Sequence, residues 1–251
     1  MKKLAFALSL LVALSLSGCG LLARQRTTAT ASPTPSAIAS PTPAATAGPA
    51  FTRQEALDYF AEIAFGSEYG DEEATVAKWA SPIKATVLGE PTEEDRKAVT
   101  RVMDGLNAVE GFPGMNLLEA GREDRNMEIW FVPLDRMAAA VPGYVEGNWG
   151  FFTVNLDSDS IQSATVAIAT DVTKQRERNH LIFEEIIQAM GLMQDAGRYH
   201  DSIFYGPWTT VQKPTVLDWE LVRMLYLPQI KEGMVRNEAL SVLADTYIPR
   251  N

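Results

Sequence analysis

The sequence predicts an α+β domain built around a mixed sheet. Three observations support this fold class: capping sequences open helical stretches, short apolar runs bounded by turn residues indicate strands, and helical spacing returns later in the chain. The elements follow in the order helix, strand, helix, strands and helices, which is typical of α+β or mixed three-layer folds. The chain has 251 residues, 46% of them hydrophobic, which is enough for one good-sized domain. We expect that domain at residues 51–251.

The first elements are marked by their caps. Thr52-Arg53-Gln54-Glu55 has the capping-box form, and apolar residues follow at helical spacing, so a helix is expected over 53–65. The apolar run at 84–89 predicts a strand. After Pro91, Thr92 and the acidic residues behind it open a second helix that continues to Val109.

Four short apolar runs then predict four more strands, at 115–118, 127–132, 149–154 and 163–169. The last two are joined by a hinge at 155–159, in which Asn and Asp alternate as they do at the beginning of a calcium-binding loop. No glycine stands at Ser160, and the twelfth loop position is Val166 instead of a glutamate. A hairpin turn is therefore the preferred interpretation.

A predicted helix near 178–192 is the most informative segment. Its apolar side chains cover a wide arc, while Glu184, Glu185 and Gln188 share the opposite stripe. Two leucines also fall on that stripe, so two interpretations stay open: a solvated face, or a face that lines a cleft. His180 is interpreted as a capping or packing residue, with a contact to Glu184 as the alternative.

The N-terminal residues carry a targeting signal. Lys2 and Lys3 precede an apolar run at 4–16 that is shorter than the roughly 20 residues of a membrane-spanning helix, so residues 1–18 are predicted to be a signal peptide. The signal ends in Leu16-Ser17-Gly18-Cys19, which resembles the lipobox of bacterial lipoproteins. We expect Cys19, the only cysteine, to be acylated with chains such as palmitate and to hold the protein on the extracytoplasmic face of the cell membrane.

Residues 19–50 are predicted to form the lipidated N-terminus and a tether. From Thr27 the tether consists almost entirely of Ala, Ser, Thr, Pro and Gly and carries no charge, so it buries too little apolar surface to fold. A plain spacer is the preferred interpretation, and a glycosylated or wall-spanning stalk is the alternative.

The charge balance and the absence of several catalytic and ligand-binding motifs narrow the range of functions that the sequence predicts. Residues 51–251 carry 18 basic and 32 acidic side chains, which excludes nucleic acid as the expected partner. The sequence holds no Gly-x-Ser-x-Gly, no phosphate-binding loop and no Cys-x-x-Cys. His200, Asp201 and Ser202 are neighbours in the sequence and cannot easily converge as a catalytic triad.

Two motifs carry a resemblance to a known class of peptidases. Glu184-Glu185-x-x-Gln188-x-x-Gly191-Leu192 resembles the metzincin zinc-peptidase signature His-Glu-x-x-His-x-x-Gly, with both histidines replaced. Further along, Asp201-Ser202-Ile203-Phe204-Tyr205 resembles the turn that carries a methionine beneath the metal in those enzymes, with Phe204 in place of the methionine.

A third motif extends the resemblance. Asp218-Trp219-x-x-Val222-x-x-Leu225-Tyr226 resembles the closing helix of matrixin-like domains. The whole set is similar to an uncharacterised family of bacterial secreted proteins and lipoproteins placed beside zincin-like peptidases, in which the Glu-Glu-x-x-Gln-x-x-Gly-Leu form recurs. The resemblance implies a single zincin-like, metzincin-like domain with an active-site-type helix near 178–192.

The resemblance also implies a set of site residues. Glu185 stands at the position of the peptidase's general base and is the candidate catalytic residue. The residues expected to line the cleft are Glu184, Gln188, Gln194, Asp195, His200 and Tyr205. Glu184, Gln188 and Gln194 stand where zinc ligands would be, and because amide oxygens are weak zinc ligands we expect no zinc. Calcium or magnesium, aided by Asp195, stays open as a variant.

Two functions follow from these observations. The first is a membrane-anchored lipoprotein whose metallopeptidase-like domain is non-catalytic and binds a peptide or an envelope protein in the former substrate groove. The second is a hydrolase with an altered site at Glu184, Glu185 and Gln188, because a buried glutamate pair can act as an acid and base. In a third interpretation these side chains only tie the helix to a neighbouring strand.

Overall fold

The computed structural model describes residues 2–5, 51–66 and 74–250. Cys19, the tether at 19–50 and the predicted signal peptide lie outside these residues, apart from the four residues of the first strand. Within the described part of the chain, every helix is too short or too polar to cross a membrane.

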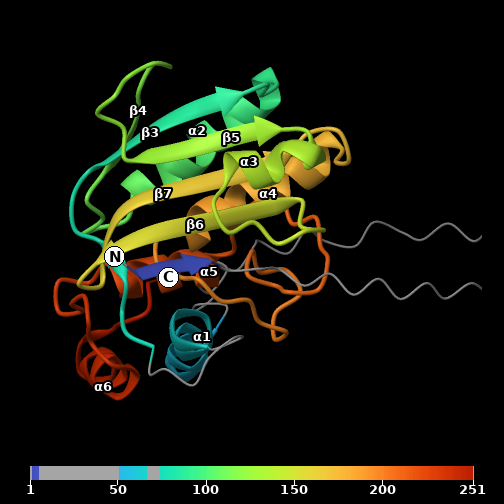
Figure 1. Ribbon diagram of the computed structural model, residues 1–251. Helices are drawn as coiled ribbons and strands as arrows, with labels where there is room; N and C mark the ends of the chain where they lie inside the picture. The colour runs from blue at the N-terminus through green and yellow to red at the C-terminus, as the bar shows by residue number, and fades with distance from the viewer. Residues whose placement is uncertain (1, 6–50, 67–73, 251) are drawn as a thin grey trace, which may run out of the picture. The chain divides into compact units, whose positions relative to one another are not determined.

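Seven strands among the described residues form one mixed sheet (Figure 1). They are β1 (Lys2–Ala5), β2 (Lys78–Trp79), β3 (Ile83–Gly89), β4 (Met115–Leu117), β5 (Met127–Val132), β6 (Gly150–Asp157) and β7 (Ser160–Ala169). The order is β1-β6-β7-β5-β3-β4, with β2 beside β7. β6 runs antiparallel to β7 and to β1, and the other pairs are parallel. The expected mixed sheet is confirmed, and because most strands are parallel and alternate with helices, the arrangement is a mixed α/β one.

Six α-helices accompany the sheet in the described residues. They are α1 (Arg53–Phe65), α2 (Glu93–Asn107), α3 (Met137–Ala140), α4 (Gln175–Gln188), α5 (Val216–Leu225) and α6 (Arg236–Thr246). α2 and α4 pack together on one face of the sheet, and the short α3 lies on the other face (Figure 1). α1 packs against α5 and α6 at the end of the molecule beyond β6.

The capping sequences mark the helix beginnings correctly. Thr52 and Thr92 each accept a hydrogen bond from the third backbone N–H of the helix, while the residue at that position, Glu55 or Asp95, accepts from the cap backbone. Thr215 and Asp218 form a third capping box at α5. Each box satisfies N–H groups that have no partner inside the helix.

The turn between β6 and β7 is tighter than the expected hinge at 155–159. Only Ser158 and Asp159 form the turn, and both have positive φ values, of 47° and 69°. A two-residue hairpin of this twist requires the left-handed conformation at both central residues. Asn155 and Asp157 therefore belong to β6 and are not loop ligands for calcium.

Helix α4 begins and ends earlier than the sequence pattern suggests, at Gln175 and Gln188. Gly191 follows with a φ of 118°, a conformation that other residues rarely adopt. A Cβ atom built there would lie 2.0 Å from the carbonyl oxygen of Ala77. Leu192 and Gln194 therefore follow the helix and do not continue its stripe.

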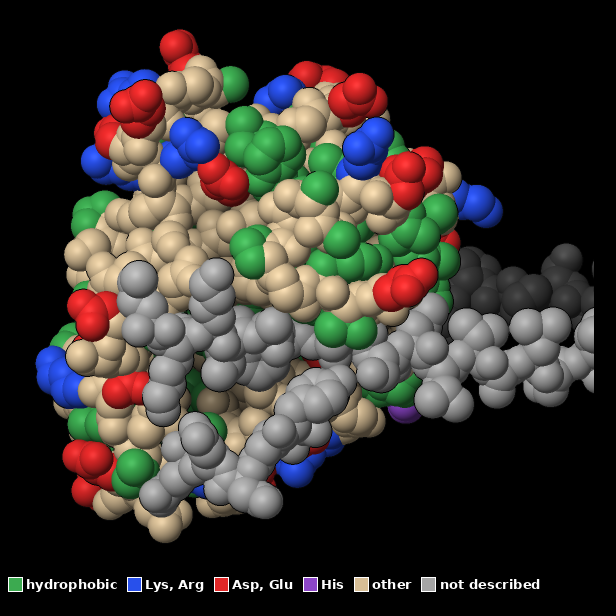
Figure 2. Space-filling model, viewed as in Figure 1, with side chains coloured by type: hydrophobic (Ala, Val, Ile, Leu, Met, Phe, Trp, Pro, Cys, Tyr) green, Lys and Arg blue, Asp and Glu red, His purple; other side chains and the backbone are tan. Residues whose placement is uncertain are grey.

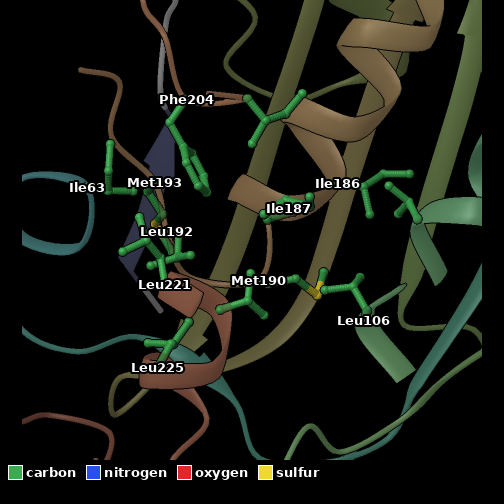
Figure 3. Close-up of a cluster of buried hydrophobic side chains, with 14 of the residues drawn as sticks. Ile63, Leu106, Ile186, Ile187, Met190, Leu192, Met193, Phe204, Leu221 and Leu225 are labelled. Carbon is green, nitrogen blue, oxygen red and sulfur yellow. The ribbon is translucent and has the colours of Figure 1, made fainter. Parts of the chain in front are cut away.

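The main core includes buried residues of α4, α1, α2 and α5. Figure 3 shows Ile186, Ile187 and Met190 facing Leu106 on one side and Leu221 on the other. All five side chains are completely buried. Burying each of them contributes about 1.5–3 kcal/mol, so this contact region fixes α4 in the middle of the fold.

We predict that Gly191→Ala lowers the free energy of unfolding by more than about 3 kcal/mol, because the new Cβ meets the Ala77 carbonyl oxygen and the backbone conformation becomes strained. Urea unfolding followed by circular dichroism measures the change. The control is Gly197→Ala, where a Cβ meets no atom within 4 Å and the change should stay under about 1 kcal/mol. Equal stabilities of the two variants would contradict this account of the helix end.

Candidate functional site

The polar stripe of α4 is enclosed in the protein. Glu184, Glu185 and Gln188 are 2%, 3% and 5% exposed, so the stripe is not a solvated face. The antiparallel strand β6 lies over α4 at this point. A Cβ atom at Gly150, the first residue of β6, would lie 2.4 Å from the Oε1 atom of Glu185. The glutamate side chain thus fills the space that a larger residue at 150 would need.

Burial controls the protonation of the two glutamates. Loss of water raises the pKa of Glu184 well above its usual range, and the nearby carboxylates of Asp195 and Glu185 raise it further. The pKa of Glu185 rises for the same reasons, burial first and the charge of Asp195 second. Gln188 donates a hydrogen bond from Nε2 to Asp195 Oδ1 at 2.6 Å and so ties the helix to the segment that follows it.

His180 completes the buried group, one helical turn before Glu184. Its Nδ1 lies 3.1 Å from the carbonyl oxygen of Val211, an acceptor, so Nδ1 carries the ring proton. Burial lowers the pKa of His180 to about 4, so the ring is neutral. The unprotonated Nε2 then faces Glu184 Oε2 at 3.5 Å, and that oxygen makes no hydrogen bond within the described residues. The alternative of a His180–Glu184 contact is confirmed, as a neutral pair rather than an ion pair.

A loop at 206–213, which we name the strap, covers the beginning of α4. Arg176 donates from Nε to Thr210 Oγ1 at 3.0 Å, and Gln212 donates from Nε2 to the Arg176 carbonyl at 2.9 Å. The indole of Trp208 packs edge-on against Trp149, with ring centroids 5.1 Å apart, and against His180 at 6.2 Å. The strap and the residue before β6 therefore close over the histidine.

The structure separates the residues that the sequence grouped as one cleft. Glu184, Glu185, Gln188 and Asp195 come together, as described above. Gln194 lies with its Cβ and Cγ against Gly66, at the end of α1. His200 is exposed and packs edge-on against Tyr205, at 4.8 Å between ring centroids. Neither ring is among the described contacts of the two glutamates.

The donor set does not fit a zinc site. Within the described residues, no three His, Cys, Asp or Glu side chains are arranged to hold a metal ion. At the three positions that correspond to zinc ligands, Glu184 has a raised pKa, the Gln188 amide donates to Asp195, and Gln194 lies against Gly66. Zinc requires deprotonated or neutral lone-pair donors that converge on one point.

Sequence reasoning missed three contributors to this group: Gly150, Trp149 and Trp208. They reach α4 from strand β6 and from the strap, far from it in the sequence. The signals available were a Trp-Gly pair at the start of a predicted strand and Gly206-Pro207-Trp208 in a segment without periodicity. The completed arrangement can hold and release protons, and its access to water is closed by packing.

Comparison with known protein families finds a family that this chain matches. Residues 53–245 match the model of a family described as "Protein of unknown function (DUF2927)". The match covers most of the chain and all of α1 through α5. No curated protein matches the sequence.

We predict that stability falls as the pH rises above about 6.5. Above that value His180 is neutral in both states, whereas burial raises the pKa of Glu184 and Glu185 in the folded chain, so each keeps its proton to a higher pH than it does in the unfolded chain. Each such group lowers the free energy of unfolding by about 1.4 kcal/mol per pH unit until its folded pKa is reached. Urea unfolding between pH 6.5 and 9 measures the slope.

Glu185→Gln should reduce that slope, because glutamine resembles the protonated side chain and does not titrate. Glu119→Gln, at an exposed position, is the matched control and should keep the wild-type slope. An unchanged slope in Glu185→Gln would mean that Glu185 is ionised in the folded protein.

Proposed function

The chain belongs to this family of unknown function, and we propose that it is an extracytoplasmic lipoprotein that binds an extended peptide along β6 without cleaving it. Acylated Cys19 would hold the protein on the cell membrane, and the Ala/Ser/Thr/Pro-rich tether would set the domain away from the bilayer. The partner would be a peptide segment of an envelope protein. The domain is then a metallopeptidase-like scaffold that has lost its metal.

The pairing of β1 with β6 is the observation that carries this proposal. Four residues at the N-terminus lie antiparallel on β6, with Lys2 opposite Leu156 and Ala5 opposite Thr153. An edge strand that accepts an extended segment of its own chain has the backbone groups free to accept one from a partner. If residues 1–18 are removed as a signal peptide, this edge is left open in the mature protein.

The zincin-like fold is part of the proposal. It is supported by the position of α4, whose Glu184-Glu185-x-x-Gln188 sequence lies under the antiparallel strand β6. The turn at 201–205 and the helix α5 also act together, since Ser202 donates from Oγ to Asp218 Oδ1 at 2.6 Å and the Ile203 N–H donates to Asp218 Oδ2 at 3.1 Å.

We propose that the domain is not catalytic for two reasons, the closed access to Glu185 and the lack of suitable zinc ligands. A general base must reach a water molecule or substrate, whereas Glu185 is enclosed under Gly150 and has a raised pKa. The donors around it do not fit zinc, which would otherwise supply the electrophile. We therefore propose that the domain holds no zinc. Calcium and magnesium favour ionised carboxylates, which the same burial disfavours.

One observation favours the alternative function, an altered hydrolase. Neutral His180 and protonated Glu184 face each other at 3.5 Å, an arrangement that could pass a proton between them. Substrate would reach this pair only after the strap moved away from His180 and Trp149. This alternative requires catalysis that depends on Glu184, Glu185 and Gln188.

We predict that the chain expressed from residue 20 binds a Lys-Lys-Leu-Ala peptide and that binding protects β6 amides from hydrogen exchange. Val154→Pro should abolish the protection. The Ala169 N–H donates to the Trp149 carbonyl, so position 149 faces β7 with its backbone N–H and C=O groups. These groups alternate in direction along an antiparallel strand, so the odd-numbered residues of β6 face β7 and the N–H of Val154 faces the open edge. Proline removes that donor and is tolerated at a strand edge.

Val154→Ala is the matched control, because it shortens the same side chain but keeps the N–H, and it should still bind. If the peptide still protects the β6 amides of Val154→Pro from hydrogen exchange, the strand-addition proposal is wrong. Mass spectrometry of the incubated peptide tests the alternative: an intact peptide is expected, whereas cleavage that Glu185→Gln abolishes would establish a hydrolase. Near one equivalent of zinc in the purified protein would contradict the metal-free proposal.

We predict that Cys19→Ser releases the protein from the membrane, because serine offers no thiol for acylation. Growth with labelled palmitate should label the wild-type protein and leave Cys19→Ser unlabelled. Ser17→Ala, at a neighbouring small residue, is the control and should stay labelled. Labelled Cys19→Ser protein would place the acyl chain elsewhere.

A further inference from the structure

The outer face of the sheet carries a hollow that the proposed peptide site does not use. It has a volume of about 400 Å³, which lies within the range of roughly 300–1,000 Å³ that is typical of small-molecule sites. The side chains around it are Arg125, Asn126, Glu128, Ser163, Ala164 and Thr165, from the beginning of β5, the middle of β7 and the residues just before β5. We name it the outer hollow. Helix α3 covers the other end of the same two strands.

The chemistry of this face is unusual for a sheet made mostly of parallel strands. Such sheets are normally covered by apolar packing on both faces. Here the residues in register on this face of three strands are Thr86, which is completely buried, and Glu128 and Thr165, which are partly exposed. Figure 2 shows that polar uncharged side chains and backbone dominate this part of the sheet, while charged side chains gather toward its rim.

The polar groups of the outer hollow are held in fixed orientations. Glu128 accepts from Arg125 Nε at 2.6 Å on one oxygen and from the indole Nε1 of Trp130 at 3.0 Å on the other. Asn126 donates to the Pro82 carbonyl at 3.1 Å and accepts from the Lys84 N–H at 2.6 Å. Groups that are fixed before binding lose little entropy when a ligand arrives.

Hydroxyl groups complete the lining of the outer hollow. Ser163 Oγ accepts from Asn155 Nδ2 at 2.9 Å, which leaves its own O–H available as a donor. The hydroxyl of Thr165 has no hydrogen-bond partner within the described residues. Trp130, whose indole N–H donates to Glu128, lies outside this lining and packs against the apolar cluster that contains Met137 of α3.

Charge decides which ligand this lining fits. Arg125 is neutralised by Glu128, and Glu123 adds a further negative charge at the rim. The negative charge of Glu123 and of the acidic domain around it would repel a phosphate or carboxylate ligand. A neutral ligand with many hydroxyl groups matches the donors and acceptors of this lining and brings no charge that the carboxylates would repel. We propose that the outer hollow binds a neutral oligosaccharide.

The test uses the purified full-length protein and isothermal titration with three neutral probes: cellohexaose, mannohexaose and chitohexaose in its N-acetylated form. Saturable binding of at least one probe is expected. Thr165→Val keeps the side-chain shape and removes the hydroxyl, and Glu128→Gln breaks the pair with Arg125, so each should weaken binding at least tenfold. Thr246→Val, on α6 outside the outer hollow, should bind as the wild-type protein does.

Two results would overturn the proposal: no saturable binding of any probe up to 10 mM (on the order of the weakest specific affinities), or binding that Thr165→Val and Glu128→Gln leave unchanged. The lining of the outer hollow includes no residue of β6, so a saturating Lys-Lys-Leu-Ala peptide should leave sugar binding to the chain expressed from residue 20 intact. Competition between the peptide and the sugar would place the sugar on the β6 edge and reject the outer hollow.

Discussion

The burial of helix α4 on every side is the constraint on which the rest of the structure depends. Ten of its fourteen residues are buried, among them His180 and the two glutamates. A charge in such a position must be paired or neutralised. Arg178 is paired, because its Nε donates to the completely buried Asp95 at 3.1 Å. His180 and the glutamates have no such partner, and they are buried as neutral groups.

The neighbours of α4 are adapted to that burial. Strand β6 begins with a glycine where Glu185 needs space, and Gly191 lets the chain leave the helix beside the Ala77 carbonyl. The strap supplies the Val211 carbonyl, which fixes the ring proton of His180. Asp195, just after the helix, is bound by Gln188 at its end. Each of these contacts joins α4 either to a segment far away in the sequence or to the residues that directly follow the helix.

Local signals in the sequence were sufficient for most elements and insufficient for the site. The capping boxes at Thr52 and Thr92 are complete within four residues, so the beginnings of α1 and α2 could be predicted to the residue. The stripe on α4 could not be placed, because periodicity separates polar from apolar faces but does not reveal what covers a polar one. Gly150 and Trp208 cover this region, and they come close to α4 only through the tertiary fold.

The buried glutamates link peptide binding to protonation under the proposed function. Burying a carboxyl group away from water costs free energy, so the burial of Glu184 and Glu185 does not by itself stabilise the fold. Glu185 lies beneath the first residue of the strand to which a peptide would add. If a peptide on β6 changes how closely Gly150 packs on Glu185, it changes the pKa of that carboxyl group, and by linkage peptide binding then depends on pH. Under the proposed function, the edge of β6 and the acids beneath its first residue therefore act as one site, whereas the outer hollow lies on the opposite face of the sheet.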